Sequence, residues 1–264
     1  MNELSGKIAL VTGGARDIGR AVSIRLAELG AVVAVNYRSN LEEAEETVRQ
    51  ITHKGGRAIA VQGNVVIASD IARVVEKVSA EFGGRIDILV NVAGGLIARK
   101  TILEMDESHW DSVIDLNLKS VFLVTKAVLP LMPDGGVIVN FSSQAGRDGG
   151  GPGASAYAAA KAGVANYSRA LAKELASRRI RVNTVSPGMI ATKFHDTFTK
   201  PEVRERVASM TPVGREGTSE EVAELTAFLA SPRSSFINGE SVEINGGIFF
   251  SSDGKNSAPR NDDS

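Results

Sequence analysis

Short apolar runs alternate with stretches of helical periodicity along most of the chain, and this alternation limits the fold more than any other feature. Residues 7–11 and 31–35 are apolar runs of strand length, and residues 18–29 between them carry apolar side chains at helical spacing. Further strand-length runs follow at residues 57–61, 86–90, 136–142, 180–185 and 241–244. Strands separated by helices pair in parallel through right-handed crossovers. We therefore expect one α/β domain, residues 1–250, with a doubly wound parallel sheet of about seven strands and helices on both faces.

Two segments depart from this alternation. Residues 190–217 are long and polar, with Phe194 and Phe198 among them, which is typical of a mobile lid over a site. Residues 251–264 are polar with almost no apolar side chains. We predict that this tail is disordered or is held by a neighbouring subunit.

Composition excludes several classes of function. The net charge is -1, so no broad basic field is available for nucleic acid or an anionic membrane. There is no cysteine, and the three histidines are widely separated, which argues against a metal site. The chain shows no signal segment and no apolar run of membrane-spanning length. We expect a soluble cytoplasmic protein.

A glycine-rich turn, Thr-Gly-Gly-Ala-Arg-Asp-Ile-Gly at residues 12–19, joins the first strand to its helix. Such a turn suits a diphosphate, because the helix N-terminus offers free N–H groups and a positive dipole end. Together with the parallel sheet, it indicates a Rossmann fold with Gly13 and Ile18 at a dinucleotide. Asp17 stands where a third glycine would ease close approach. Its charge would repel phosphate unless Arg16 offsets it, and it is a candidate N-cap of the helix.

The end of the second strand indicates which dinucleotide binds. Tyr37, Arg38 and Ser39 follow that strand, and Arg16 lies nearby in the first turn. An acidic residue here binds a ribose 2′-hydroxyl, whereas a basic one accommodates a 2′-phosphate. The chain has no carboxylate before Glu42, so we favour NADP(H) over NAD(H); the alternative is that Arg38 is an ordinary surface residue.

The sequence Tyr-Ala-Ala-Ala-Lys at residues 157–161 is the main candidate for chemistry. Tyr157 and Lys161 lie four residues apart on a predicted helix, and so share one face. An ammonium close to a phenol favours the phenolate, so we predict that Lys161 lowers the pKa of Tyr157. The pair would then exchange a proton with a substrate oxygen. Taken alone, the motif is common and is more often an ordinary exposed Tyr and Lys on a helix.

Several motifs occur together in a recognisable order. They are the turn at 12–19, Asn-Val-Ala-Gly at 91–94, Asn117, Ser142-Ser143, the 157–161 motif and Ser-Pro-Gly at 186–188. In this arrangement the chain resembles the short-chain dehydrogenase/reductase family over nearly all of residues 5–247. The nearest resemblance is to β-ketoacyl-carrier-protein reductases and to related sugar or alcohol dehydrogenases.

The resemblance implies roles for the candidate catalytic residues. Tyr157 would be the general acid/base, and Lys161 would lower its pKa and hold the nicotinamide ribose. Ser143, rather than Ser142, would orient the substrate carbonyl. Asn117, in a long helix predicted at 107–131, would anchor a proton-relay water through a bend in that helix. Its alternative is a polar residue satisfied by the helix backbone.

The resemblance also implies cofactor contacts and an assembly. Asn64 and Val65 would bind adenine, and the Asn offers a carbonyl acceptor where Asp is usual. The nicotinamide side would be lined by Asn91, Ala93, Gly94, Pro187, Gly188, Ile190 and Thr192. Val92 replaces the usual second Asn of its motif. The alanine-rich helix around Tyr157 is expected to build a dimer interface, with dimers pairing into a homotetramer.

The substrate is less defined. Five polar or basic residues are expected near the site, namely Arg99, Gln144, Arg147, Lys193 and His195. Such a set suits a small polar keto compound, for example a keto-sugar or a keto-acid. The alternative is that these are solvent-facing loop residues. Reduction of a 3-oxoacyl carrier protein is the second candidate, with residues 178–181 (Arg-Arg-Ile-Arg) as a docking patch, although the loop at 132–136 carries no base.

Two other classes stay open beside these substrates. A non-catalytic nucleotide-binding regulator would not need the full set of Ser143, Tyr157 and Lys161. A cofactor-retaining isomerase or dehydratase usually has an added substrate domain, for which the chain is too short.

Overall fold

The computed structural model describes residues 3–250. Its centre is one seven-stranded sheet in the order β3-β2-β1-β4-β5-β6-β7, and every neighbouring pair is parallel. The doubly wound parallel sheet predicted from the alternation of apolar runs is therefore confirmed. The prediction for the polar tail, 251–264, lies outside the described residues.

The strands are short, and the central ones are buried along their whole length. Their bounds are β1 Ile8–Thr12, β2 Val32–Tyr37, β3 Arg57–Gln62, β4 Ile88–Asn91, β5 Val137–Phe141, β6 Arg181–Pro187 and β7 Ser241–Ile244. The main helices are α1 Asp17–Glu28, α2 Leu41–His53, α3 Ala68–Phe82, α4 Glu107–Ile114, α5 Ser120–Val128, α6 Ala145–Asp148, α7 Ser155–Glu174, α8 Lys193–Phe198, α9 Pro201–Met210 and α10 Ser219–Ala230. Short 3-10 turns lie at Leu129–Leu131, Ala176–Arg178, Pro232–Ser234 and Ile248–Phe250.

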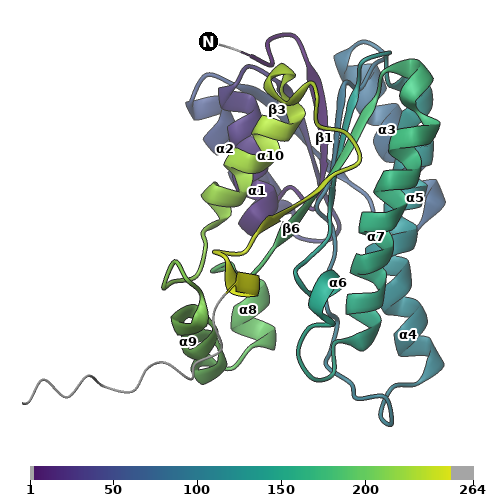
Figure 1. The fold of residues 1–264 in the computed structure, drawn as a ribbon. Coiled ribbons are helices and arrows are strands. Elements are labelled where there is room, and N and C mark those ends of the chain that lie inside the picture. The colour runs from purple at the N-terminus through teal and green to yellow at the C-terminus, as the bar shows by residue number, and fades with distance from the viewer. Residues whose placement is uncertain (1–2, 251–264) are drawn as a thin grey trace, which may run out of the picture.

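Helices cover both faces of the sheet, as Figure 1 shows, with α1, α2 and α10 on one side and α3, α5 and α7 on the other. Two apolar cores result, one on each face. Val22, Leu26 and Leu229 are among the fully buried side chains of the first core, and Val78, Leu89 and Ile138 among those of the second. Burying each such side chain contributes about 1.5–3 kcal/mol, so the two-sided burial of the strands is the main force that orders the sheet.

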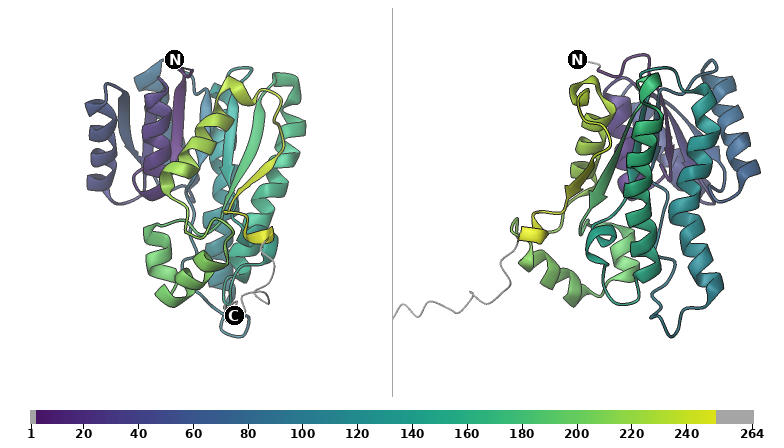
Figure 2. Two further views of the ribbon diagram at one scale, coloured as in Figure 1. Left: turned by 60° about the vertical axis from the view of Figure 1, so that its left-hand side comes forward. Right: turned by 45° about the vertical axis from the view of Figure 1, so that its right-hand side comes forward.

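The strand order reverses between β1 and β4, which pair from Ala9 with Ile88 to Thr12 with Asn91. In open parallel sheets, ligands bind outside the carboxyl ends of the strands at such a reversal. The helices α8 and α9 lie beyond this carboxyl edge of the sheet, away from the N-terminus (Figures 1 and 2). The fold therefore places the segment predicted as a lid, residues 190–217, across the expected site.

The long helix predicted at 107–131 is interrupted. Its middle turn, Asp115–Lys119, is a π-helix between α4 and α5, and a 3-10 turn ends it. π-helical turns inside α-helices are rare and frequent at functional sites. The helix is therefore irregular where the family resemblance implied a bend, with Asn117 at the centre of the π-helical turn.

Candidate active site

A large cavity opens at the carboxyl edge of the sheet, with a volume of about 1310 Å³. It is lined by nearly all the residues proposed from the sequence: Gly13, Arg16, Asp17, Ile18, Tyr37, Arg38, Ser39, Asn64, Val65, Ala93, Gly94, Ser143, Tyr157, Lys161, Pro187, Gly188, Ile190 and Thr192. These residues come from several separate connections of the chain. The sheet therefore brings the predicted cofactor and catalytic residues into one space.

Two proposed residues do not line this cavity. Asn91 is buried on β4, where its Nδ2 donates to Oδ1 of Asn140 at 2.9 Å. Asn140 in turn donates to Ser168 on α7. The Asn91 amide is therefore engaged inside the fold, between β4 and β5, and the cofactor contact that the resemblance implies for Asn91 stays a prediction.

Asn117 is the second proposed residue that does not line the cavity. It contacts the cavity wall only through the backbone of Gly95. Its Oδ1 accepts from the Gly95 N–H at 2.9 Å, and its Nδ2 donates to the Gly95 and Val113 carbonyls at 2.8 and 2.9 Å. The amide thus satisfies both the helix and the loop after β4. The alternative interpretation is confirmed, because backbone groups satisfy the Asn117 amide, whereas its role beside a proton-relay water stays a prediction. In this structure Asn117 is a positioning residue.

The turn between β1 and α1 is shaped for close approach. Gly13 has φ +63°, and a Cβ on Gly19 would lie 2.0 Å from the Gly13 carbonyl oxygen, so the turn tolerates no side chain there. The Gly14 N–H donates to the Asn36 carbonyl at 3.0 Å. The first N–H groups of α1 consequently stay free to face the cavity, which fits the diphosphate of a dinucleotide.

Asp17 differs from expectation. Arg16 occupies the N-cap position and makes no side-chain cap, while Asp17 is the first helical residue. Asp17 has φ +47°, in the left-handed region that glycine adopts without cost. Its Oδ1 accepts from the Lys193 N–H at 3.2 Å instead of capping α1. The N-cap interpretation is therefore wrong, and the carboxylate contacts the lid segment.

The adenosine end of the cavity has a basic rim. Arg16, Arg38 and Ser39 are exposed and line it, and Asn40 caps α2 by accepting from the Glu43 N–H at 3.1 Å. On the opposite wall, Oδ1 of Asn64 accepts from the Val66 N–H at 3.3 Å. The two arginines lie beside the end of β2, where a Rossmann fold receives the adenosine ribose, and their charge is consistent with a 2′-phosphate.

The two adjacent serines have different partners. Ser142 is buried, and its Oγ donates to the Lys161 carbonyl at 2.7 Å, so it secures α7. Ser143 lines the cavity together with Tyr157; its Oγ accepts from the Ala145 N–H at 3.2 Å, and its hydroxyl is close enough to the phenol to lower the pKa of Tyr157. This geometry supports Ser143 as the residue beside the reacting oxygen.

The electrostatics of the pair on α7 are opposite to the sequence-based prediction. Burial raises the pKa of Tyr157 to about 12, and the hydrogen bond from Ser143 offsets this only in part. Burial also lowers the pKa of Lys161 to about 8. The Lys161 Nζ donates to the Phe141 carbonyl at 2.8 Å and lies 5.6 Å from the centre of the Tyr157 ring. The prediction of a lowered phenol pKa is therefore wrong for this structure, because desolvation by burial is the largest cause of the shift at Tyr157.

The substrate side of the cavity is aromatic. The Phe194 ring lies 6.0 Å from the Tyr157 ring and 5.2 Å from that of Phe198, measured between ring centres. Val203 and Val207 of α9 extend this wall. An apolar wall this close to the phenol favours a substrate with apolar atoms next to its carbonyl.

The polar residues proposed to recognise a carboxylated substrate are occupied. Arg99 donates to the Phe198 and Pro152 carbonyls, each at 2.9 Å. Arg147 stacks on the Phe249 ring at 4.5 Å, and Gln144 donates to Asp148 at 2.9 Å.

The remaining two are also unsuited to bind an anion. Lys193 pairs with Glu43, and burial lowers the pKa of His195 to about 4, so this ring is neutral at pH 7. The argument for a keto-acid thus loses its main support.

Ile97 is a feature of the cavity wall that the sequence did not reveal. It has φ +66°, and the Ala98 N–H donates to the Leu96 carbonyl at 2.8 Å, which closes a γ-turn of the rare type. A β-branched residue in this conformation is strained, and such strain concentrates at ligand sites. No local sequence signal marks it; on either side of it, the Gly95 N–H donates to Asn117 and Arg99 donates to the Pro152 carbonyl.

Within residues 3–250 no group of acidic and histidine side chains could hold a metal ion. In the same part of the chain no helix is long and apolar enough to cross a membrane.

A parallel sheet with a glycine turn at its reversal point and a Ser-Tyr-Lys set at its carboxyl edge defines an oxidoreductase of the Rossmann type. Comparisons with known proteins agree. Residues 13–249 match a family described as "Enoyl-(Acyl carrier protein) reductase". The chain belongs to the short-chain dehydrogenase/reductase family.

Individual relatives are similar over nearly the whole chain. The chain is 42% identical over 247 residues to the 3-oxoacyl-[acyl-carrier-protein] reductase FabG of Staphylococcus aureus, covering 92% of this chain and 98% of the relative. A solved short-chain dehydrogenase/reductase of Serratia marcescens is 33% identical with a TM-score of 0.88, covering 93% of this chain and 98% of that one. A blue fluorescent protein from a metagenomic library, solved in complex with NADPH, is 32% identical with a TM-score of 0.87, covering 93% and 99%.

Proposed function

We propose that this protein is an NADPH-dependent reductase that converts the ketone of a 3-oxoacyl substrate to an alcohol. The observation that carries the proposal is the Ser143–Tyr157 pair at the foot of an aromatic wall, inside a cavity whose other end has a basic rim. The relative named 3-oxoacyl-[acyl-carrier-protein] reductase supports this substrate class over the keto-sugar or keto-acid favoured by the sequence.

The reaction divides among the residues as follows. The cofactor, when bound, supplies a hydride to the carbonyl carbon. Ser143 donates a hydrogen bond to the carbonyl oxygen as negative charge develops there. The Tyr157 hydroxyl then transfers its proton to that oxygen. Lys161 supports the phenolate that remains, and its bond to the Phe141 carbonyl fixes its position.

The raised pKa of Tyr157 favours the direction of reduction. A phenol with a pKa of about 12 stays protonated at neutral pH, as a proton donor must. The reverse reaction would need the phenolate. We therefore expect ketone reduction to be nearly independent of pH between about pH 6 and 7.5, and alcohol oxidation to accelerate as the pH rises above about 8.

A carrier-protein partner needs a docking surface near the cavity, and residues 178–181 do not provide one. They lead into β6, of which Arg181 is the first residue, and so lie at the amino edge of the sheet, opposite the cavity. Arg178 and Arg179 both pair with Asp134, and Arg181 donates to the Ser231 carbonyl. These contacts and this placement count against the patch at residues 178–181, and the acyl chain is the part of the substrate that the aromatic wall supports.

The test measures loss of reduced-nicotinamide absorbance with short 3-oxoacyl thioesters, keto-acids and keto-sugars, each with NADPH and NADH. We expect turnover with the thioesters and NADPH. Turnover of keto-acids alone, or faster turnover with NADH, would overturn the proposal. Tyr157→Phe should lower kcat by about 10²- to 10⁴-fold and leave NADPH affinity nearly unchanged, whereas a variant with normal activity would exclude Tyr157 as the acid.

The homotetramer and the cytoplasmic location stay predictions. A mass measurement in solution at micromolar concentration tests the first, and a monomer as the sole species would refute it.

A further inference from the structure

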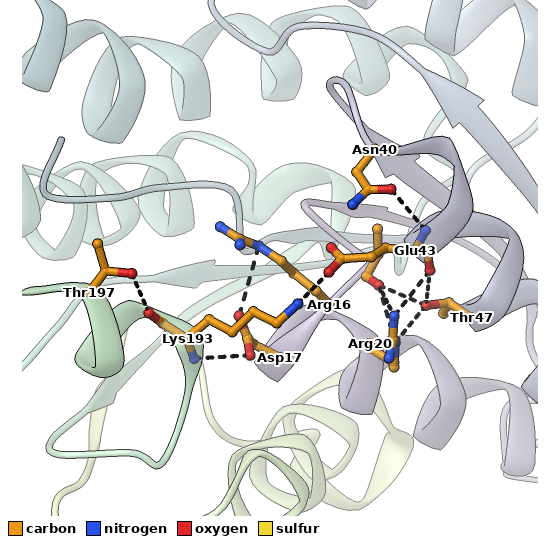
Figure 3. A network of polar contacts seen from close by, with 9 residues as sticks. Arg16, Asp17, Arg20, Asn40, Glu43, Thr47, Lys193 and Thr197 are labelled. Carbon is orange, nitrogen blue, oxygen red and sulfur yellow. Dashed lines mark hydrogen bonds and ion pairs between the residues drawn. The ribbon is translucent and has the colours of Figure 1, made fainter.

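The lid segment is joined to the cofactor-binding half of the protein by a small polar network, drawn in Figure 3. Lys193, the first residue of α8, contributes two donors to it. Its backbone N–H donates to Oδ1 of Asp17 at 3.2 Å, and its Nζ lies 2.5 Å from Oε1 of Glu43. One residue of the lid thus contacts both the glycine-rich turn and α2, on the far side of the cavity.

The two segments that carry the Asp17 and Glu43 carboxylates are joined to each other by hydrogen bonds. The Ala15 carbonyl accepts from Arg20 Nη2 and from Thr47 Oγ1, each at 2.9 Å, and Arg20 also donates to the Glu43 carbonyl at 3.2 Å (Figure 3). These bonds fasten the glycine-rich turn to α2. Asp17 and Glu43 consequently move together, and Lys193 belongs to the opposite side of the cleft.

The lid has a hinge of its own. Ile190 and Gly217 form an isolated parallel bridge at its base, with Ala191 N–H donating to the Gly217 carbonyl at 2.9 Å. Both ends of residues 190–217 are therefore held at one place, and α8 and α9 project from it. Away from this base, Lys193 fastens the lid on the cofactor side and Arg99 fastens it at the Phe198 carbonyl.

Asp17 is energetically unfavourable in the glycine-rich turn, and its hydrogen bond with Lys193 of the lid explains why it is there. It adopts a left-handed backbone at φ +47°, which Asp and Asn tolerate better than other side chains but less well than glycine. It also brings a negative charge to a surface that would bind a diphosphate. Its contact with the lid gives a reason for both features.

We propose that Lys193, Asp17 and Glu43 form a clamp that holds the lid over the dinucleotide cleft, and that cofactor exchange requires this clamp to open. The inference rests on the proposed function, because it assumes that NADPH occupies the cleft. These three are positioning residues, since none is argued to touch the reacting atoms.

The direct test is the rate of NADPH release, measured by stopped-flow displacement. Exposed ion pairs contribute about 0.2–1 kcal/mol, so Lys193→Met and Glu43→Gln should each speed release by about 1.5- to 5-fold. The double variant should release NADPH no faster than the faster single variant, because both remove the same pair. Lys200→Met is the matched control, since Lys200 is exposed on the same segment and does not line the cavity.

A second comparison isolates the backbone contact. Asp17→Asn keeps the acceptor oxygen and the tolerance for a left-handed backbone, whereas Asp17→Gly removes the acceptor. Both remove the charge. Release from the glycine variant should therefore be faster than from the asparagine variant, and equal rates would show that the lid contact is unimportant.

Two results for NADPH release from the Lys193→Met variants overturn the clamp. One is an unchanged release rate in Lys193→Met. The other is a full effect of Lys193→Met in the Glu43→Gln background, which would place Lys193 on a cofactor phosphate instead. Hydrogen exchange of residues 190–199 without cofactor is an independent readout that should accelerate in Lys193→Met, and equal exchange also overturns the clamp. If the native protein does not bind NADPH at all, the proposed function is wrong. The hydrogen-exchange experiment without cofactor then still tests whether the clamp exists.

Discussion

Replacing Lys161 by methionine should abolish catalysis and leave the fold about as stable near neutral pH, yet change how stability depends on pH. Lys161 is 4% exposed, and burial lowers its pKa from 10.5 to about 8. That change corresponds to about 3 kcal/mol of cost for holding the ammonium in the folded state, which the substitution removes. The lost hydrogen bond to the Phe141 carbonyl offsets about 1.5–3 kcal/mol of the gain, so the net change at neutral pH is small.

The dependence on pH is the sharper readout. Because the folded pKa lies below the unfolded one, the unfolded chain binds more protons between about pH 8 and 10.5, and the native protein gains stability as the pH rises through this window. The methionine side chain in the variant does not titrate. The free energy of unfolding of the native chain, relative to that of Lys161→Met, should therefore increase by about 2 kcal/mol from about pH 7.5 to 10.

Urea unfolding at fixed protein concentration measures this difference. The pH series of these measurements ends near pH 10. Above that, the unfolded chain releases the Tyr157 proton before the folded protein does, because burial raises the pKa of Tyr157 to about 12, and the fold loses stability. Lys173→Met, at an exposed position of the same helix, is the matched control and should not change the slope. A difference between native chain and Lys161→Met that stays constant across the window would refute the argument that burial dominates this lysine.

Three further outcomes are expected. Gly94→Ala places a methyl 2.8 Å from Oδ1 of Asn117 and should lower kcat by about tenfold or more. At Gly95 the nearest atom is 3.8 Å away, so Gly95→Ala should be tolerated, and equal losses in kcat from the two variants would contradict this. Arg38→Leu should lower kcat/KM with NADPH by about 10- to 100-fold and barely affect NADH, and a parallel loss with both would exclude a role at the 2′-phosphate. Ile97→Gly should be about 1–2 kcal/mol more stable than Ile97→Ala in urea unfolding, and the reverse order would show that the left-handed turn is unstrained.

The sheet and most of the cavity wall were predictable because they depend on local patterns. The strands β1, β2, β4 and β5 are mostly apolar runs separated by helical periodicity, and parallel pairing then brings their carboxyl ends together. The glycine-rich turn, Ser143 and the 157–161 motif each carry a local signature. Their convergence on one edge follows from topology, which is why they could be placed without knowing any distance.

What the sequence could not supply depends on long-range contacts. Asp17 looks like an N-cap until Lys193, 176 residues away, is seen to occupy its carboxylate. The π-turn around Asn117 covers only five residues, Asp115–Lys119, and the pattern at 107–131 predicts one continuous helix, in which only the family resemblance implies a bend. The pKa of Tyr157 reflects desolvation by segments far along the chain, and counting charges four residues apart gave the wrong sign.

The reversal of strand order has an evolutionary consequence. The adenosine-side wall of the cavity comes from residues 13–66, whereas Ser143, Tyr157 and the lid come from residues beyond 140. The residues that set coenzyme preference and those that set substrate preference thus come from separate segments of the sequence. In the fold, the two halves of the sheet join where β1 pairs with β4. Recombination between relatives could exchange one segment and preserve the other, provided that the partners of Lys193 at positions 17 and 43 are inherited with a matching residue at position 193.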